Sequence, residues 1–284
     1  MEPLLQNISD TARWVAVFRA EESERPNAIF HDPFARRLAG QRGEQIADAI
    51  GFSRKNSWSF VARTFLFDDI IKKHVAEGFD TVINLAAGLD TRPYRMDLPA
   101  TLRWIEVDLP GILDYKESIL AGEKPVCGLE SIRLDLADKD QRLSLFRQLG
   151  KQVIKALVIT EGLMIYLEAR EAAELAGDLS EQTSFGRWAF DIVSPPLLAM
   201  SQKEMGPVLK EANIVFKFAP ENGEAFFHPY GWKSIASYSK LKTAATLNRL
   251  PEEMMGFASM PEPEGPIRPF PWTGVCLFEN MHTA

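Results

Sequence analysis

The sequence predicts an α/β fold, a doubly wound and mostly parallel sheet that follows a helical N-terminal segment. Short apolar runs alternate with stretches of helical spacing from residue 81 onward, which indicates βαβ units with right-handed crossovers. We expect each run to form a strand buried on both faces, as in a parallel sheet. The expected strands cover residues 81–86, 103–107, 132–135 and 156–160, and the expected helices between them cover residues 110–120 and 138–149.

The first eighty residues are predicted to be helical. Asp32 and Pro33 are typical of a helix start, and Gly40 is expected to end that short helix. A longer helix is predicted from residue 57 to its stop at Gly78.

Aromatic side chains gather in this longer helix. They suggest either a lid over an apolar substrate or a helix packed on the sheet. These side chains are Trp58, Phe60, Phe65 and Phe67.

Beyond the fourth strand we expect a fifth at residues 187–193, which ends at Ser194-Pro195-Pro196. A helix is predicted near residues 231–239, and a last strand at residues 273–279 follows a proline-rich stretch.

The composition excludes several classes of protein. A net charge of −7 disfavours a nucleic-acid surface, and no apolar stretch reaches the length of a membrane span. The N-terminal residues lack the basic and apolar regions of a signal peptide. Cys127 and Cys276 have no metal-binding or redox spacing. We therefore expect a cytoplasmic protein of 284 residues with no metal site, no nucleic-acid partner and no membrane association.

Candidate binding residues follow successive strands. Gly88 comes after the first strand, and Asp108 stands twenty residues later, after the second. Asp135 and Glu161 follow the third and fourth strands. Since ligands bind at the carboxyl ends of parallel strands, this rim indicates a bound nucleoside whose ribose hydroxyls donate to an acid.

The first loop discriminates between nucleoside cofactors. Residues 86–91 read AAGLDT, so the G-x-G-x-x-G pattern of dinucleotide sites is incomplete. Asp90 would also repel a pyrophosphate. S-adenosyl-L-methionine has no phosphate and carries a sulfonium and an ammonium group, which suit carboxylates such as Asp90 and Glu161.

These motifs resemble the leucine carboxyl methyltransferase and polyketide O-methyltransferase family. A glycine–tryptophan pair, Gly231-Trp232, gives further similarity. The matching motifs are HDPFA at residues 31–35, ART at 62–64 with FD at 67–68, NLAAGLDTR at 84–92, EVDLP at 106–110, DL at 135–136 and EGLMIYL at 161–167.

The resemblance implies a class I methyltransferase, a Rossmann-like fold with seven strands of which the last is antiparallel. It implies one domain, residues 1–284, in which residues 1–78 form a helical cap. Residues 79–284 would form the core, with substrate-side insertions after residue 195.

The resemblance also assigns cofactor-binding roles at the methionine end. Arg63 looks like the residue that holds the methionine carboxylate, for which a guanidinium is suited. Gly88 would lie against the methionine moiety, and Glu161 would face its amino-acid end. Without the motif, a surface ion pair of Arg63 with Asp68 or Glu77 would be the default interpretation.

At the adenosine end, Asp108 is expected to bind the ribose hydroxyls, while Asp135 and Leu136 flank the adenine. The chain departs from the family at Ala86, where the family usually has glycine. We expect alanine to be tolerated there, at a strand end that does not require a positive φ.

The expected function is therefore an S-adenosylmethionine-dependent O-methyltransferase that acts on a carboxylate or a phenolic hydroxyl of a small apolar acceptor. The alternatives are a short-chain-type NAD(P)-dependent oxidoreductase and a non-catalytic S-adenosylmethionine-binding protein. No catalytic residue is assigned. Tyr166 is expected to pack in the core, and His228 is expected to be a packing or loop residue. The aromatic segment around His228 is a candidate pocket wall.

Overall fold

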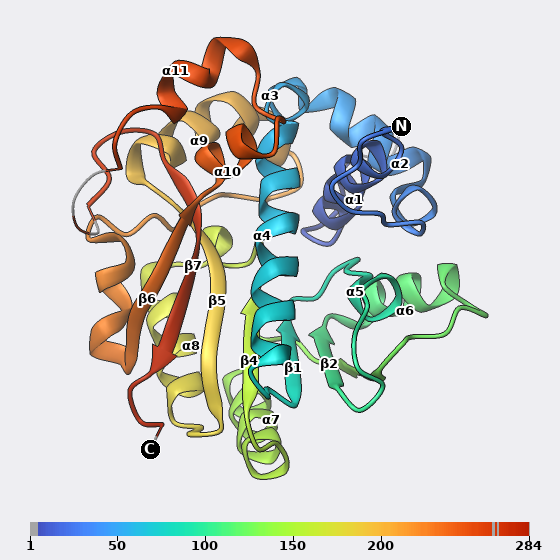
Figure 1. The fold of residues 1–284 in the computed structure, drawn as a ribbon, viewed down its shortest axis with the longest axis vertical. Coiled ribbons are helices and arrows are strands. Elements are labelled where there is room, and N and C mark those ends of the chain that lie inside the picture. The colour runs from blue at the N-terminus through green and yellow to red at the C-terminus, as the bar shows by residue number, and fades with distance from the viewer. Residues whose placement is uncertain (1–4, 263–264, 266, 284) are drawn as a thin grey trace.

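The computed structural model describes residues 5–262, 265 and 267–283. Its centre is a seven-stranded sheet in the order β3-β2-β1-β4-β5-β7-β6 (Figure 1). The strands are β1 (Thr81–Leu85), β2 (Arg103–Asp108), β3 (Gly128–Arg133), β4 (Ala156–Thr160), β5 (Phe185–Val193), β6 (Trp232–Ser239) and β7 (Thr273–Asn280).

The strand directions confirm the predicted fold class. The neighbours from β3 through β5 pair in parallel, and β7 pairs antiparallel to both β5 and β6. The sheet is therefore mixed, with its reversed strand inserted between β5 and β6.

Strand β6 corrects the helix predicted near residues 231–239. The segment pairs with β7, and Trp232 is fully buried at its start while Lys233 is exposed. Gly231 precedes it with a φ of 88°, which lets the chain turn into the strand. Long-range pairing with β7 thus overrides a local pattern that resembles a helix.

Strand β3 corrects a second expectation. It begins at Gly128, earlier than predicted, and most of its residues are exposed or half-buried. Because β3 lies at an edge of the sheet, it packs fewer side chains than β1 or β4, which are buried throughout.

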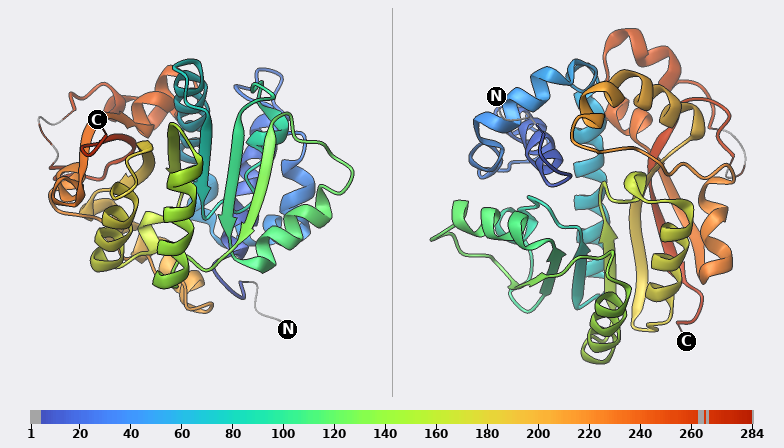
Figure 2. Two further views of the ribbon diagram at one scale, coloured as in Figure 1. Left: turned by 90° about the horizontal axis from the view of Figure 1, so that it is seen from below. Right: turned by 180° about the vertical axis from the view of Figure 1, so that it is seen from behind.

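Helices cover both faces of the sheet. The apolar side chains of α4 (Ser57–Ala76), among them Phe67 and Ile71, pack on Val82, Trp104 and Leu157. On the opposite face, α7 (Lys139–Gln152) and α8 (Ala169–Ser180) pack on a second set of strand residues. Figure 2 shows these layers in the views from below and from behind.

The remaining helices lie mostly around the carboxyl ends of the parallel strands. Figure 1 places α1–α3 and α9–α11 at the upper end of the sheet. They are α1 (Asp10–Ser23), α2 (Ala35–Ala49), α3 (Gly51–Lys55), α5 (Arg92–Arg95), α6 (Pro110–Ile119), α9 (Pro195–Lys210), α10 (Lys240–Thr246) and α11 (Met255–Ala258), and the 3-10 turns are η1 (Met164–Tyr166), η2 (Gly223–Tyr230) and η3 (Glu252–Met254).

Helix α2 confirms the end of the predicted short helix but not its cap. Gly40 has a non-helical φ of 58° and ψ of −177°, so the short helix ends there and a second helical segment continues to Ala49. The residue before α2 is Phe34, whose side chain makes no capping hydrogen bond, and Asp32 accepts from Arg19 and Thr91 with Oδ2 and from the Phe34 amide with Oδ1. In the part of the chain that the structure describes, no helix is long and apolar enough to cross a membrane.

Candidate active site

A cavity of about 1240 Å³ lies beyond the carboxyl ends of the parallel strands. Its walls come from the strand-end loops, from α1 and α4, and from the segments that follow β5. The structure brings together all the residues that we expected to bind the cofactor. The cavity is lined by Arg63, Gly88, Asp108, Asp135, Leu136 and Glu161, among others.

The loop after β1 is built around Gly88. Its amide donates to Oδ2 of Asp108 over 2.6 Å, and the Leu109 amide donates to Oδ1 of the same carboxylate over 2.7 Å. Gly88 has a φ of +52°, and a Cβ at this position would come within 3.2 Å of the Ala12 side chain. The two predicted residues Gly88 and Asp108 are therefore hydrogen-bonded to each other, and a side chain at position 88 would crowd Ala12 of helix α1.

The same loop corrects our expectation for Ala86. Its φ is 54°, so the residue lies in the left-handed region that favours glycine. Alanine is held there because its amide donates to the Val107 carbonyl over 2.8 Å, which fixes the end of β1 against β2. The substitution of the usual glycine by alanine therefore costs backbone strain, about 1 kcal/mol.

Helix α1 is hydrogen-bonded to this loop through Arg19. Nη2 of Arg19 donates to the Leu89 carbonyl over 2.6 Å, and its Nε donates to Asp32 over 2.8 Å. Thr91 donates to the same Asp32 oxygen over 2.7 Å. Asp32, the acid of the HDPFA motif, thus links the N-terminal helices to the loop after β1.

The loop after β3 carries Asp135 and Leu136. The exposed Asp135 accepts from the Ala137 amide over 2.9 Å, which turns the loop back on itself. Arg142 donates to the Leu136 carbonyl over 2.7 Å and pairs with Asp178 in the adjacent helix. A buried arginine from α7 therefore fixes the backbone at this end of the cavity.

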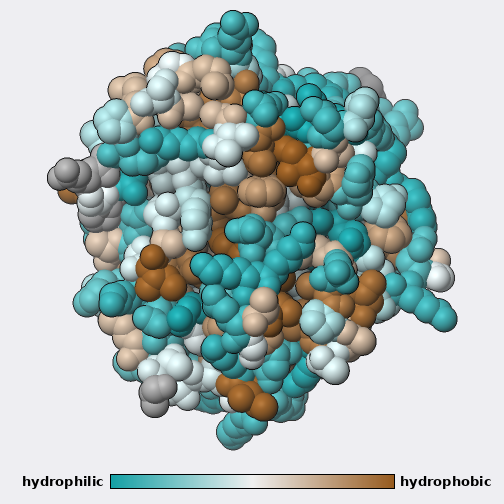
Figure 3. All heavy atoms as spheres, viewed as in Figure 1, coloured by the Kyte–Doolittle hydropathy of each residue, from teal (hydrophilic) through white to brown (hydrophobic). Residues whose placement is uncertain are grey.

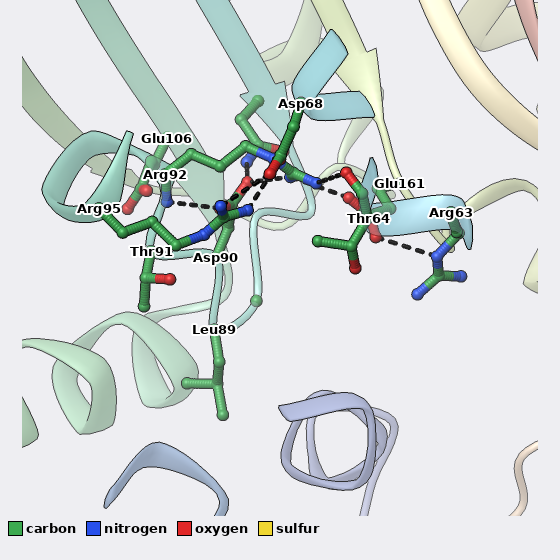
Figure 4. Close-up of polar contacts among 12 residues, drawn as sticks. Arg63, Thr64, Asp68, Leu89, Asp90, Thr91, Arg92, Arg95, Glu106 and Glu161 are labelled. Atoms are coloured by element: carbon green, nitrogen blue, oxygen red, sulfur yellow. Dashed lines mark hydrogen bonds and ion pairs between the residues drawn. The ribbon is translucent and has the colours of Figure 1, made fainter. Parts of the chain in front are cut away.

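Arg63 points from α4 toward the ends of β4 and β5. Its Nε donates to Glu161 over 2.9 Å and its Nη1 to Asp191 over 3.2 Å. The guanidinium is nine-tenths buried, so the default interpretation of a surface pair with Asp68 or Glu77 is wrong. Figure 4 shows Glu161 between Arg63 and Arg92.

Arg92 joins three carboxylates. It lies 2.6 Å from Asp68, 2.7 Å from Asp90 and 2.9 Å from Glu161. Burial opposes ionisation of Asp90, but the charges of Arg92 and Lys116 outweigh it and hold the pKa of Asp90 at about 2. Asp90 and Glu161, the two carboxylates that the sequence suggested for cationic cofactor groups, are thus both paired with Arg92.

Two functional candidates escaped the sequence analysis. Asp191, in β5, accepts from the Gly162 amide over 2.7 Å and from Arg63, and Nζ of Lys240 lies 3.0 Å from it. Both residues line the cavity and are buried or nearly so. Asp191 was hidden inside an apolar run, although a lone acid in such a run is itself a signal. Lys240 was missed because the preceding segment was predicted as a helix.

The aromatic side chains of α4 divide between the cavity and the core. Trp58 and Phe60, in the first turn of the helix, line the cavity. Phe65 and Phe67 pack with the core on one face of the sheet. Packing on the sheet is therefore confirmed for Phe65 and Phe67, and the lid stays a prediction for Trp58 and Phe60.

His228 is exposed in η2 and lies outside the cavity lining, as does the rest of the aromatic segment around it. That segment packs on the core, where Phe227 is fully buried, so its interpretation as a pocket wall is wrong. Tyr166 both packs on Phe216, with ring centroids 5.4 Å apart, and lines the cavity.

The wall formed by the C-terminal third of the chain is mainly apolar. Several of its side chains are partly exposed at the molecular surface, and hydrophobic residues gather at the upper left of Figure 3, where Figure 1 places α9 and α11. The apolar residues of this wall include Leu197, Met200, Met205, Met254, Phe257, Met260, Phe270 and Trp272.

Comparison with known proteins identifies the chain. The model of the leucine carboxyl methyltransferase family matches residues 12–179. The chain belongs to this family. It is 29% identical over 245 residues to a putative S-adenosyl-L-methionine-dependent methyltransferase of Streptomyces avermitilis, covering 83% of this chain and 86% of the relative. A relative with the same description from a Parafrankia species is 30% identical over 260 residues, covering 87% and 84%.

Solved structures support the fold. A putative methyltransferase from Thermobifida fusca aligns with a TM-score of 0.60 and 14% identity, over 100% of this chain and 97% of the other. A DUF574 family protein from Streptomyces avermitilis aligns with a TM-score of 0.59 and 14% identity, over 94% and 96%. The comparisons confirm the expected family, the methyltransferase class and the expected cofactor, and neither alternative function finds support among them.

Proposed function

We propose that this S-adenosylmethionine-dependent methyltransferase methylates an oxygen, in a carboxylate or a phenolic hydroxyl, of a small apolar acceptor. The observation that carries the proposal is the lining of the cavity at the strand ends. Polar strand-end loops form one part of it, and the apolar wall formed by the C-terminal third of the chain forms another. A nucleoside cofactor and an apolar acceptor would fit side by side in such a space.

The residues present suit the cofactor. Asp108 is already oriented by two backbone amides and keeps lone pairs for the ribose hydroxyls. Asp135 and Leu136 would flank the adenine. Gly88, which we expect beside the methionine moiety, lines the cavity.

The methionine end would lie beside Arg63 and Glu161. Arg63 donates to Glu161 through Nε and to Asp191 through Nη1. Since a guanidinium has five N–H donors, donors remain for the methionine carboxylate. Glu161 faces Arg63 and Arg92 with different oxygens, which holds it in place for the ammonium group.

When bound, the cofactor supplies an electrophilic methyl group on its sulfonium. The chain's own contribution is to orient the acceptor oxygen in line with that group and to exclude water, for which buried apolar walls are suited. A carboxylate acceptor is ionised at neutral pH and needs no general base, whereas a phenol gains from one. We also propose that residues 1–284 form one domain, in which residues 1–78 act as a cap on the core.

Isothermal titration of the purified protein with S-adenosylmethionine, and separately with NADH, tests the cofactor site. We expect micromolar binding of S-adenosylmethionine, no binding of NADH, and affinity for S-adenosylmethionine about 100-fold lower in Arg63→Ala and in Asp108→Ala. Binding of NADH alone would overturn the proposal.

Methyl transfer is tested with a panel of apolar carboxylic acids and phenols, with product detection by mass spectrometry. A methyl ester or methyl ether is the expected product. Binding of the cofactor with no product from either class would instead favour a different acceptor atom.

A further inference from the structure

The apolar wall contains one deeply buried cation. Lys240 begins α10, directly after β6, and its side chain is 6% exposed. It lines the cavity together with Trp272 and Thr273. An ammonium has three N–H donors, and the one hydrogen bond found for it among the described residues goes to Asp191. Donors are therefore left on a buried group that lines the cavity, and buried polar groups without partners are costly.

The ion-pair network that includes Lys240 is electrically balanced. It runs from Arg95 through Asp68 and Arg92 to Glu161, Arg63, Asp191 and Lys240. Its members are four acids and four bases: Asp68, Asp90, Glu161, Asp191, Arg63, Arg92, Arg95 and Lys240.

This balance bears on the acceptor. The cofactor of the proposed function brings a net positive charge, from its sulfonium and ammonium groups against one carboxylate. Asp108 and Asp135 also line the cavity, but at the proposed adenosine end. At the methionine end the cofactor adds its charge to a balanced network. A negatively charged acceptor beside Lys240 offsets that charge, and a buried pair of opposite charges interacts more strongly than a pair in water.

We propose that Lys240 binds the acceptor, by donating to a negatively charged oxygen on an otherwise apolar molecule. This inference rests on the proposed function and extends it to the recognition of the acceptor. Asp191 would position the ammonium, since it is itself held by Arg63 and by the Gly162 amide. An ionised oxygen attacks the methyl carbon as the carbon–sulfur bond breaks, the sulfur keeps the electron pair, and Lys240 retains its proton.

The apolar part of the acceptor would lie along the surrounding wall. Met200, Met260 and Phe257 line the cavity and are exposed by 36%, 53% and 62%, so they form its rim. Methionine side chains adapt to ligands of different shape. The anionic oxygen comes from either a carboxylate or a phenolate, and the experiment distinguishes the two.

The test uses the full chain saturated with S-adenosylhomocysteine and three probes of similar apolar size: decanoate, 4-heptylphenol and 1-decanol. Titration calorimetry measures each affinity. At neutral pH we expect decanoate, or 4-heptylphenol if the site ionises it, to bind about tenfold more tightly than 1-decanol. Lys240→Met should remove this preference, while Lys240→Arg should retain most of it. Lys233→Met, at an exposed lysine of β6, is the matched control and should behave as the wild type.

Equal binding of all three probes to the wild type, or no binding, would overturn the inference without any variant. So would an unchanged preference in a folded Lys240→Met. A purely structural role for Lys240 predicts a lower melting temperature with the preference intact. Failure of the proposed function is separate, because it would appear as absent binding of S-adenosylhomocysteine before any probe is added.

Discussion

The two sides of the cavity are built in different ways. The side at the ends of β1–β3 is made of short loops, whose polar groups bond to backbone amides nearby, as Asp108 does to Gly88 and Leu109. The opposite side is made of apolar side chains from α9, from η3 and α11, and from the segment before β7, which are distant in sequence. The first is specified by local motifs and the second by long-range packing. We expect the first to determine the cofactor and the second the acceptor.

Asp108→Ala is the strongest test of whether one side of the cavity determines the cofactor and the other the acceptor. It removes the charged acceptor of two backbone amides and the proposed partner of the ribose hydroxyls, so affinity for S-adenosylmethionine should fall about 100-fold. Affinity for decanoate, measured at saturating S-adenosylhomocysteine, should be unchanged. Asp135→Ala is the comparison on the same rim, and its exposed side chain should cost less than about tenfold. A smaller effect at Asp108 than at Asp135 would contradict the assignment.

A buried ion pair beneath the polar side makes stability depend on pH. Burial raises the pKa of Glu106 from 4.5 to about 7, although Lys116 lies 2.7 Å away. The folded chain then retains a proton that the unfolded chain releases between these values. This contribution to the free energy of unfolding is present below pH 4.5 and is lost as the pH rises through about 7.

The loss is on the order of 3 kcal/mol for such a shift. Urea unfolding across this pH range, in the wild type and in Glu106→Gln, measures it. The Gln variant cannot titrate and should show the flatter profile. Identical profiles would mean that folding does not raise the pKa of Glu106.

A smaller effect is expected at Ala86. Ala86→Gly relieves a left-handed φ of 54°, so the free energy of unfolding should rise by about 1 kcal/mol. Thermal unfolding measures the gain, and Ala87→Gly is the control, since Ala87 is not among the residues with positive φ. An equal decrease in the free energy of unfolding in both variants would show that the backbone at Ala86 is not strained.

The smallest effect should come from the rim of the apolar side. Phe257 is 62% exposed, so Phe257→Ala removes little buried area and should weaken decanoate binding about threefold. Affinity for S-adenosylmethionine should stay the same. A change in cofactor affinity of similar size would show that the two sides are coupled.

The sequence predicted the polar side of the cavity better than the apolar side, because local motifs specify the first and long-range packing specifies the second. A glycine after a strand and an acid after the next strand are local signals, and Gly88 and Asp108 do meet. Lys240 and Asp191 meet only because β6 and β5 flank β7, a pairing that no local pattern encodes. The strain at Ala86 was also unreadable, because φ depends on how the loop closes against Val107.

The placement of β7 has a consequence for biosynthesis. Strand β6 lies at the edge of the sheet and pairs with β7, which is synthesised about thirty residues after β6 ends. During synthesis on the ribosome, the backbone N–H and C=O groups of β5 and β6 that pair with β7 therefore remain unpaired until residues 273–280 have been made. Lys240, directly behind β6, would reach its place beside Asp191 only after this late step. The nascent chain would thus have its polar loops formed before its acceptor side exists, and chaperones would meet it with the apolar edge of β5 still open.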